Sequence, residues 1–331
     1  MFKLNFFILF LQFLSYKFTN SNSYNNREIF NNYIIKYNKN YASLNEYYYR
    51  YKVFNKKINR INYVNDNNYS YTLGINKFSD LTFDEFSYKY KGYNGLFYNN
   101  KYNNYHKLTL NNNNITQIDW RGEGLVTDIK DQQQCGSCWA FSAVGTMEGA
   151  KAKKTNKLVS MSEQDLLDCV PDCYGCNGGW PSLAIQYVIN GSKTEGIDTE
   201  ISYPYTAQDG TCNFTKNNIG GKFHDVIKIP EGNTKYLYDS ILSVGPISVA
   251  IDAEEDFQSY KTGIFESYMC SNTSLDHAVL VVGYGITSKN KKYYIIKNSW
   301  GTDWGMDGYI YFSADIPNMC GIAQDACYAV Y

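Results

Sequence analysis

The distribution of cysteines constrains how this chain can fold. All nine cysteines lie beyond residue 134, and the polar segment before them, which is rich in Tyr, Asn and Lys, contains none. Any disulfide cross-links are therefore confined to the C-terminal part of the chain. A chain this rich in cysteine fits an oxidising compartment, because thiols of cytosolic proteins stay reduced.

One of these cysteines lies in a stretch suited to nucleophilic chemistry. Cys138 stands in the sequence Gln-Gln-Gln-Cys-Gly-Ser-Cys-Trp-Ala-Phe, and His277 and Asn298 follow far downstream. A thiol, an imidazole and a carboxamide are the parts of a Cys-His-Asn catalytic triad. Residues 138–153 are rich in alanine with apolar residues at helical spacing, so we expect Cys138 to begin a helix. The helix dipole and a neighbouring imidazolium would then lower the pKa of the thiol.

These motifs resemble those of papain-like cysteine proteases, and the resemblance covers all of the chain except its first residues. It implies that Asn298 holds the imidazole of His277 in one orientation. It also implies that the oxyanion of the reaction is stabilised by the backbone N–H of Cys138 and by the side-chain amide of Gln132. Without the resemblance, a glutamine in a turn is usually only solvated.

The extreme N-terminus predicts a cleaved secretory signal over residues 1–20. It carries one lysine and then an apolar stretch that is too short to cross a membrane. No later stretch approaches the roughly 20 consecutive apolar residues of a membrane helix, so we expect no membrane span.

Residues 24–113 resemble an inhibitory propeptide. Five residues recur at spacings of four and seven along one side of a predicted long helix, and they match the E-R-F-N-I-N pattern of papain-family propeptides. They are Glu46, Arg50, Phe54, Ile61 and Asn65, with Lys57 in the place of the first Asn of the pattern. Residues 74–80 match the companion G-x-N-x-F-x-D pattern. An amphipathic helix followed by a turn would explain the spacing, but not both patterns in order.

The propeptide is expected to end in an exposed linker. Residues 111–114 are four consecutive asparagines, a poorly packing sequence of the kind that proteases cut. We therefore expect the full-length chain to be latent and to become active after processing between about Leu110 and Thr116.

The cysteines other than Cys138 number eight, and sequence alone cannot choose among their pairings, which are on the order of 100. The resemblance implies the disulfides Cys135–Cys176, Cys169–Cys212 and Cys270–Cys320. Cys173 and Cys327 have no counterpart in that pattern, and they either pair with each other or stay as thiols. A zinc site at residues 169, 173 and 176 is disfavoured because no histidine lies near. We expect no metal and no cofactor.

The pattern of helices and strands predicts an α+β fold for a peptidase unit of residues 114–331. Residues 114–225 carry helical stretches at 138–153, 162–169 and 181–190. Residues 226–331 carry short runs rich in Val, Ile and Tyr, at 247–251, 277–284, 292–296 and 308–312. The resemblance implies a papain-like two-lobe fold, with a helical left lobe, a β-barrel-like right lobe, a cleft between them and an N-terminal helical propeptide.

The resemblance also implies how a substrate would bind. Gly178 and Gly179 would let an extended peptide approach and pair with the backbone. The pocket for the second side chain on the acyl side of the cut would be lined by Trp180, Pro181, Ala250 and Leu275, with Asp325 at its floor. A carboxylate there should point to water or recruit a cation, and a substrate arginine could supply that cation.

These features together predict a cysteine endopeptidase of the secretory pathway, made as an autoinhibited precursor and acting through a thioester acyl-enzyme. The expected partners are protein and peptide substrates and its own propeptide as inhibitor, and the resemblance adds cystatin-like proteins as further inhibitors. The net charge of −1 gives no reason to expect nucleic acid. We expect a monomer, located in a lysosome-like compartment or outside the cell.

Two other classes of protein stay open. A catalytically inactive papain-like binding or storage protein is the main alternative, although such a protein would normally have lost a triad residue and this chain keeps all three. A metal-dependent hydrolase is disfavoured, because the chain has only three scattered histidines and no His-Glu-x-x-His pattern.

Overall fold

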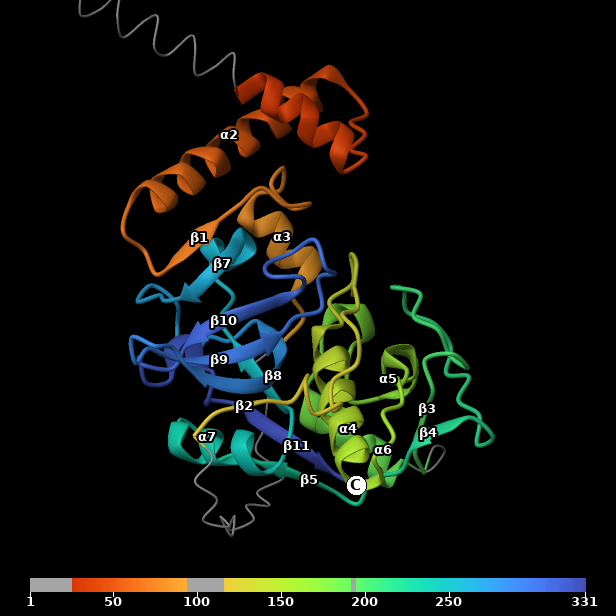
Figure 1. Ribbon diagram of the computed structural model, residues 1–331. Coiled ribbons are helices and arrows are strands. Elements are labelled where there is room, and N and C mark those ends of the chain that lie inside the picture. The colour runs from red at the N-terminus through yellow and green to blue at the C-terminus, as the bar shows by residue number, and fades with distance from the viewer. Residues whose placement is uncertain (1–25, 94–115, 192–194) are drawn as a thin grey trace, which may run out of the picture.

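The computed structural model describes residues 26–93, 116–191 and 195–331. Residues 26–93, which we call the N-terminal segment, lie over one end of the molecule (Figure 1). This segment consists of a helix at residues 26–36, helix α2 (Leu44–Asp66), strand β1 (Tyr71–Leu73) and helix α3 (Phe83–Tyr90). Helix α3 begins with a capping box, in which Thr82 and Glu85 satisfy each other's backbone N–H groups. The predicted long helix is therefore present, and it spans the whole E-R-F-N-I-N pattern.

A mixed sheet forms most of one lobe, which we call the β lobe. Its order is β1-β7-β10-β9-β8-β6-β11-β5, and β2 also pairs with β8. The strands are β2 (Ile118–Asp119), β5 (Asp225–Lys228), β6 (Ile247–Ile251), β7 (Tyr260–Phe265), β8 (His277–Ile286), β9 (Lys292–Lys297), β10 (Tyr309–Ser313) and β11 (Ala326–Val330). Every residue of β6 is buried, as expected for a strand covered on both faces.

The N-terminal segment joins this sheet directly. Strand β1 pairs antiparallel with β7, and Tyr71 lies opposite Gly263. Gly263 has a φ of 90°, and a Cβ there would lie 2.5 Å from the backbone oxygen of Ser70, so only glycine fits. Backbone pairing of this kind extends the edge of the sheet with a strand from the N-terminal segment.

The other lobe, which we call the helical lobe, is built around α4 (Cys138–Thr155), α5 (Glu163–Cys169) and α6 (Pro181–Asn190). The short strands β3 (Ile197–Asp198) and β4 (Ile219–Gly221) pair beside them (Figure 1). The remaining helices among the described residues are α7 (Thr234–Ser243), α8 (Glu255–Gln258) and the 3₁₀ turns η2 (Gly175–Asn177) and η3 (Met319–Gly321). No helix in the described ranges combines the length and the apolar character that a membrane crossing needs.

Helix α4 is the element that joins the two lobes. It packs on β8 and β11 of the β lobe and on α5 and α6 of its own lobe. The approach to β8 is close, since a Cβ at Gly145 would lie 2.5 Å from Cδ2 of Leu280. This packing sets the first residue of α4, Cys138, beside the first residue of β8, His277.

Three disulfides cross-link the chain beyond residue 134, and they are the three pairs that the resemblance implied. They are Cys135–Cys176, Cys169–Cys212 and Cys270–Cys320. Cys173 and Cys327 are buried thiols, so of the two alternatives left open by the sequence the structure has the unpaired one.

Candidate active site

The predicted triad residues lie together where the two lobes meet. His277 Nε2 lies 2.9 Å from Asn298 Oδ1, and the indole ring of Trp300 stacks on the imidazole at a centroid distance of 4.5 Å. An amide oxygen can only accept a hydrogen bond, so Nε2 carries the proton and Nδ1 is left with a lone pair. Among the described residues, Nδ1 has no hydrogen-bond partner. The backbone N–H of Ala278, the next residue along, points at Cys138 Sγ from 3.4 Å.

Gln132 is held rigidly next to this pair. It is fully buried, its Oε1 accepts a hydrogen bond from Ser299 Oγ at 2.6 Å, and its backbone N–H donates to the Ser299 carbonyl at 2.8 Å. Its Nε2 donates to the carbonyls of Cys135 at 2.8 Å and Tyr90 at 3.1 Å. The side-chain amide of Gln132 thus already holds a carbonyl oxygen of the N-terminal segment.

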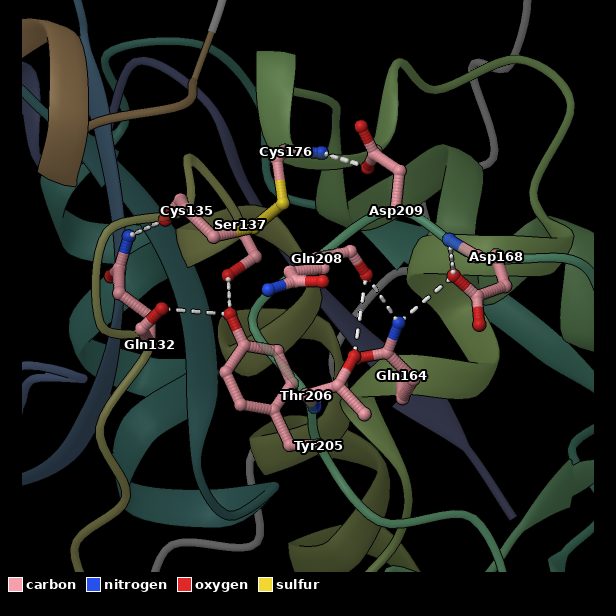
Figure 2. Close-up of a disulfide and its surroundings, with 12 residues drawn as sticks. Gln132, Cys135, Ser137, Gln164, Asp168, Cys176, Tyr205, Thr206, Gln208 and Asp209 are labelled. Carbon is pink, nitrogen blue, oxygen red and sulfur yellow. Dashed lines mark hydrogen bonds between the residues drawn. A yellow bond between two sulfur atoms is a disulfide. The ribbon is translucent and has the colours of Figure 1, made fainter.

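Tyr205 connects the loop of Gln132 to the start of α4 (Figure 2). Its hydroxyl donates to the Gln132 carbonyl at 2.8 Å and lies 2.6 Å from Ser137 Oγ. Ser137 is the N-cap residue of α4, but its side chain makes no capping hydrogen bond. The usual serine cap would satisfy a backbone N–H of the first turn, so here those N–H groups stay uncapped beside Cys138. Sequence reasoning missed Tyr205, because one tyrosine among 33 carries no signal.

The N-terminal segment runs through the site and pairs with the wall formed by Gly178 and Gly179. The N–H of Gly179 donates to the Gly92 carbonyl at 2.9 Å. Gly178 has a φ of 114°, and a Cβ there would lie 2.7 Å from the same carbonyl oxygen. On the other side, the N–H of Tyr93 donates to the Asp276 carbonyl at 3.1 Å. The two glycines therefore allow the close backbone approach that the sequence predicted for a bound peptide.

This cover changes the electrostatics of the site. Burial raises the pKa of the Cys138 thiol to about 12, and hydrogen bonds from the backbone N–H groups of Ala278 and Gly92 oppose this rise only in part. Burial also lowers the pKa of His277 to about 3, against the effect of Asn298. The sequence analysis expected a lowered thiol pKa, but that expectation assumed an imidazolium. With the N-terminal segment in place, burial favours the neutral form of both groups.

A side chain of the N-terminal segment lies among the residues predicted to line the specificity pocket. The Tyr93 ring belongs to the same buried apolar cluster as three of the predicted lining residues, Trp180, Ala250 and Leu275. Pro181, the fourth, is buried at the first position of α6. The Tyr93 hydroxyl donates to Oδ2 of Asp325, the predicted floor residue.

The cation that Asp325 was expected to recruit comes from the chain itself. Lys228 Nζ lies 2.8 Å from Asp325 Oδ1, and the two side chains are only 7% and 15% exposed. Sequence reasoning missed Lys228, although a signal exists: it is the one charged residue in the apolar run Val226–Ile229.

Ion pairs add to the contact between the N-terminal segment and the rest of the chain. Cations of the segment face carboxylates of the two lobes in the pairs Lys57–Glu255, Arg60–Asp256, Lys77–Asp131 and Lys91–Asp276. Lys57 is the residue that departs from the E-R-F-N-I-N pattern, and its second partner is Gln258 Oε1 at 2.9 Å. The departure therefore has a structural role at this contact.

A buried thiol beside a histidine–asparagine pair, between two lobes and covered by an N-terminal segment, defines a cysteine peptidase in precursor form. Within the described ranges, no group of three or more His, Cys, Asp or Glu side chains could hold a metal. The chain belongs to the papain family of cysteine proteases, whose family model matches residues 115–330. The model of the cathepsin propeptide inhibitor domain (I29) matches residues 30–86, so the N-terminal segment is from here on called the propeptide.

Similarity to known cysteine proteases extends over nearly the full chain. Digestive cysteine proteinase 1 of Homarus americanus is 43% identical over 310 residues, which cover 88% of this chain and 91% of that protein. Cathepsin L of Sarcophaga peregrina is 39% identical over 323 residues, covering 91% and 92%. The digestive procathepsin L2 proteinase of Tenebrio molitor superposes with a TM-score of 0.86 at 33% identity, covering 92% of this chain and 100% of that one. The chain is thus a cathepsin L-like endopeptidase precursor with an inhibitory propeptide.

The solved structure of a recombinant stem bromelain precursor is also similar. It superposes with a TM-score of 0.84 at 36% identity, covering 92% of this chain and 98% of that one. The papain-like α+β fold with its N-terminal helical propeptide, predicted from the sequence, is confirmed.

Proposed function

We propose that Cys138, His277, Asn298 and Gln132 carry out the peptide hydrolysis of this enzyme. The thiol of Cys138 attacks the scissile carbonyl carbon, and its proton passes to Nδ1 of His277. The observation that carries this assignment is the 2.9 Å contact between His277 Nε2 and Asn298 Oδ1, which leaves Nδ1 open for the thiol. Asn298 keeps the imidazole in that tautomer without adding a charge.

The reaction then proceeds through a thioester. The carbonyl oxygen becomes an oxyanion, which accepts hydrogen bonds from Gln132 Nε2 and from the backbone N–H of Cys138. Collapse of this intermediate breaks the C–N bond, and His277 gives its proton to the leaving amine. Water then attacks the thioester, His277 takes a proton from it, and the Cys138 thiol is restored. The carbonyl of Tyr90 next to Gln132 Nε2 supports this role, because it shows that a carbonyl oxygen fits there.

The precursor is latent because the propeptide blocks the cleft and keeps both reacting groups neutral. Acid weakens its docking, since protonation of paired carboxylates removes their attraction to the propeptide cations. Cleavage between about Leu110 and Thr116 then releases residues 114–331 as the mature enzyme; most of that stretch lies outside the described residues. We assign residues 1–20 to the signal and extend the propeptide beyond its described residues to the range 24–113.

The location is inferred from the N-terminal signal and from the relatives. A cathepsin L and two digestive proteinases are among them, so we assign the enzyme to a lysosome-like compartment or to the outside of the cell. Fractionation of expressing cells with an antibody to residues 114–331 tests this assignment.

Inhibitors test the chemistry. A thiol-alkylating epoxide should abolish peptidase activity of the processed enzyme and label Cys138, whereas a chelator should not reduce activity. Cys138→Ala should keep less than about a thousandth of the activity, and Asn298→Ala should lose less because Asn298 orients and does not react. Activity that survives the epoxide but not the chelator would overturn the assignment. A folded, processed chain without any peptidase activity would favour the binding or storage alternative.

A further inference from the structure

We propose that the pocket floored by Asp325 and Lys228 makes this enzyme select tyrosine as the second residue on the acyl side of the cleaved bond. The inference rests on the proposed function, because it concerns the substrate that the same cleft would take. It differs from the expectation from sequence, in which Asp325 would either point to water or recruit a cation such as a substrate arginine.

The propeptide shows which side chain the pocket accepts. Tyr93 is only 7% exposed, and the backbone on either side of its ring is fixed, through the Gly92 carbonyl to Gly179 and through its own N–H to Asp276. An extended chain that pairs with these two walls therefore delivers its side chain into the pocket. The Tyr93 phenol stands in for the side chain of a substrate.

The floor of the pocket is an ion pair whose charge is already balanced. Asp325 Oδ1 binds Lys228 Nζ at 2.8 Å, and Asp325 Oδ2 accepts the hydrogen bond from the Tyr93 hydroxyl. The backbone of Asp325 is fixed as well, since its carbonyl accepts from the N–H of Ala250 at 2.9 Å. Lys228 comes from β5, where it lies opposite Cys327 of the neighbouring strand β11. Both partners of the pair are thus set by the sheet and not by a mobile loop.

The hydrogen-bonding groups and charges of this floor predict the order in which substrate side chains are preferred. A phenol is neutral and donates one hydrogen bond, so it satisfies Asp325 Oδ2 and leaves the charge balanced. Phenylalanine fills the same apolar walls but leaves that oxygen without a donor from the substrate. Arginine brings a second cation beside Lys228, and like charges in a poorly hydrated pocket repel. We expect kcat/KM for tyrosine to exceed that for phenylalanine roughly tenfold, since water reaches the partly exposed carboxylate and replaces part of the lost bond.

The test compares fluorogenic dipeptides that differ only in this residue. The full-length chain is activated by its own processing, and active sites are counted by titration with the epoxide. The residues compared are tyrosine, phenylalanine, O-methyltyrosine, arginine and leucine. O-methyltyrosine keeps the ring and oxygen but cannot donate, so it should behave like phenylalanine. Arginine should rank below both.

Substitutions of the two floor residues test whether the preference for tyrosine comes from the Asp325–Lys228 ion pair. Asp325→Ala should bring the ratio of tyrosine to phenylalanine cleavage to about one. Lys228→Met should raise arginine relative to tyrosine by roughly tenfold, because arginine then becomes the partner of Asp325. Lys222→Met is the matched control, since the Lys222 side chain is 57% exposed and pairs only loosely with Glu195 at 3.8 Å. It should leave all ratios unchanged.

A substrate-free arm tests the same bond in the precursor. Tyr93→Phe removes the propeptide's donor to Asp325, so the full-length chain should process several-fold faster at a given pH, while the mature enzyme keeps its sequence. If Lys228→Met yields no titratable enzyme, the activation rate of Tyr93→Phe still tests whether the hydrogen bond from a phenol to Asp325 contributes to binding in the pocket.

Equal cleavage of tyrosine and phenylalanine peptides by the unmodified enzyme would overturn the inference, as would an Asp325→Ala enzyme that keeps the preference. Either result would leave the catalytic assignment intact. By contrast, an enzyme that hydrolyses none of the peptides and does not react with the epoxide at Cys138 would refute the proposed function itself.

Discussion

The substitution Gly92→Ala should weaken propeptide docking and speed activation of the precursor, without changing the mature enzyme. Gly92 crosses directly over the nucleophile, and its carbonyl accepts the hydrogen bond from Gly179 at 2.9 Å. A Cβ on Gly92 would lie 1.8 Å from the Gly136 oxygen, 2.3 Å from its carbonyl carbon and 2.7 Å from its Cα. All three atoms are backbone, so no side-chain rotation relieves the overlap.

The free energy of propeptide docking should fall by an amount that follows from this overlap. Ordinary contact begins at 3.4 Å, about 1.6 Å farther than the Gly136 oxygen allows, so the strand must lift away. Overpacking costs about 1–3 kcal/mol and the lost hydrogen bond to Gly179 adds about 1 kcal/mol. Docking should therefore weaken by about 2–4 kcal/mol, which is roughly 30- to 1,000-fold in the docking equilibrium.

The assay follows the rate at which the purified full-length chain gains activity toward a fluorogenic peptide at several pH values. Gly92→Ala should activate faster at every pH and show activity near pH 7 where the unmodified precursor shows none. Lys52→Ala, at an exposed lysine of α2, is the control and should activate normally. Because position 92 is removed with the propeptide, the processed enzymes should have the same kcat and KM. Activation of Gly92→Ala at the unmodified rate would refute the argument that the tight crossing at Gly136 keeps the precursor closed.

Three further changes have definite expected outcomes. Arg60→Met removes hydrogen bonds of 2.9 and 2.6 Å to buried Asp256. Because Arg60 is 41% exposed, docking should weaken by only about 1–2 kcal/mol, and the same rate assay should show activation roughly 5- to 30-fold faster. Tyr205→Phe should lower kcat about tenfold with little change in KM, because the lost hydrogen bonds orient the Gln132 loop and touch no substrate; a rise in KM with constant kcat would contradict this. The pKa of Glu85 is lowered, since burial raises it but hydrogen bonds from Arg50 and Thr82 outweigh that effect. Its stabilising contribution is thus complete above the usual value of 4.5 and is lost as pH falls below it, so Glu85→Gln should speed activation near neutral pH and make no difference at the lowest pH tested.

The helices and strands were predictable where the local pattern was strong. Helix α6 covers 181–190 and strand β6 covers 247–251, as the spacing of apolar residues predicted, and α4 begins at Cys138 as expected. These elements each bury one continuous apolar face or both faces, so the periodicity in sequence reports directly on their packing.

The parts of the site that sequence could not supply depend on contacts between distant segments. Lys228 and Asp325 are 97 residues apart, and only the pairing of β5 with β11 brings them together. The prediction of a lowered pKa for the Cys138 thiol does not hold in the precursor for a related reason. The helix dipole at Cys138 is a local feature, whereas the surroundings of the buried sulfur come from segments far away in the sequence, β8 at Ala278 and the propeptide at Gly92. A local pattern cannot report which segment will cover it.

The high pKa of the covered thiol has a consequence for how the chain matures chemically. Disulfides form and reshuffle through thiolates, and burial raises the pKa of the Cys138 thiol, which keeps the sulfur protonated. Once the propeptide has docked, the nucleophile is therefore a poor participant in exchange with the six cysteines that form cross-links. The same masking slows its oxidation to sulfenic acid in an oxidising compartment. The inhibitory segment thus also acts as a protecting group for the sulfur, removed only when the enzyme is put to use.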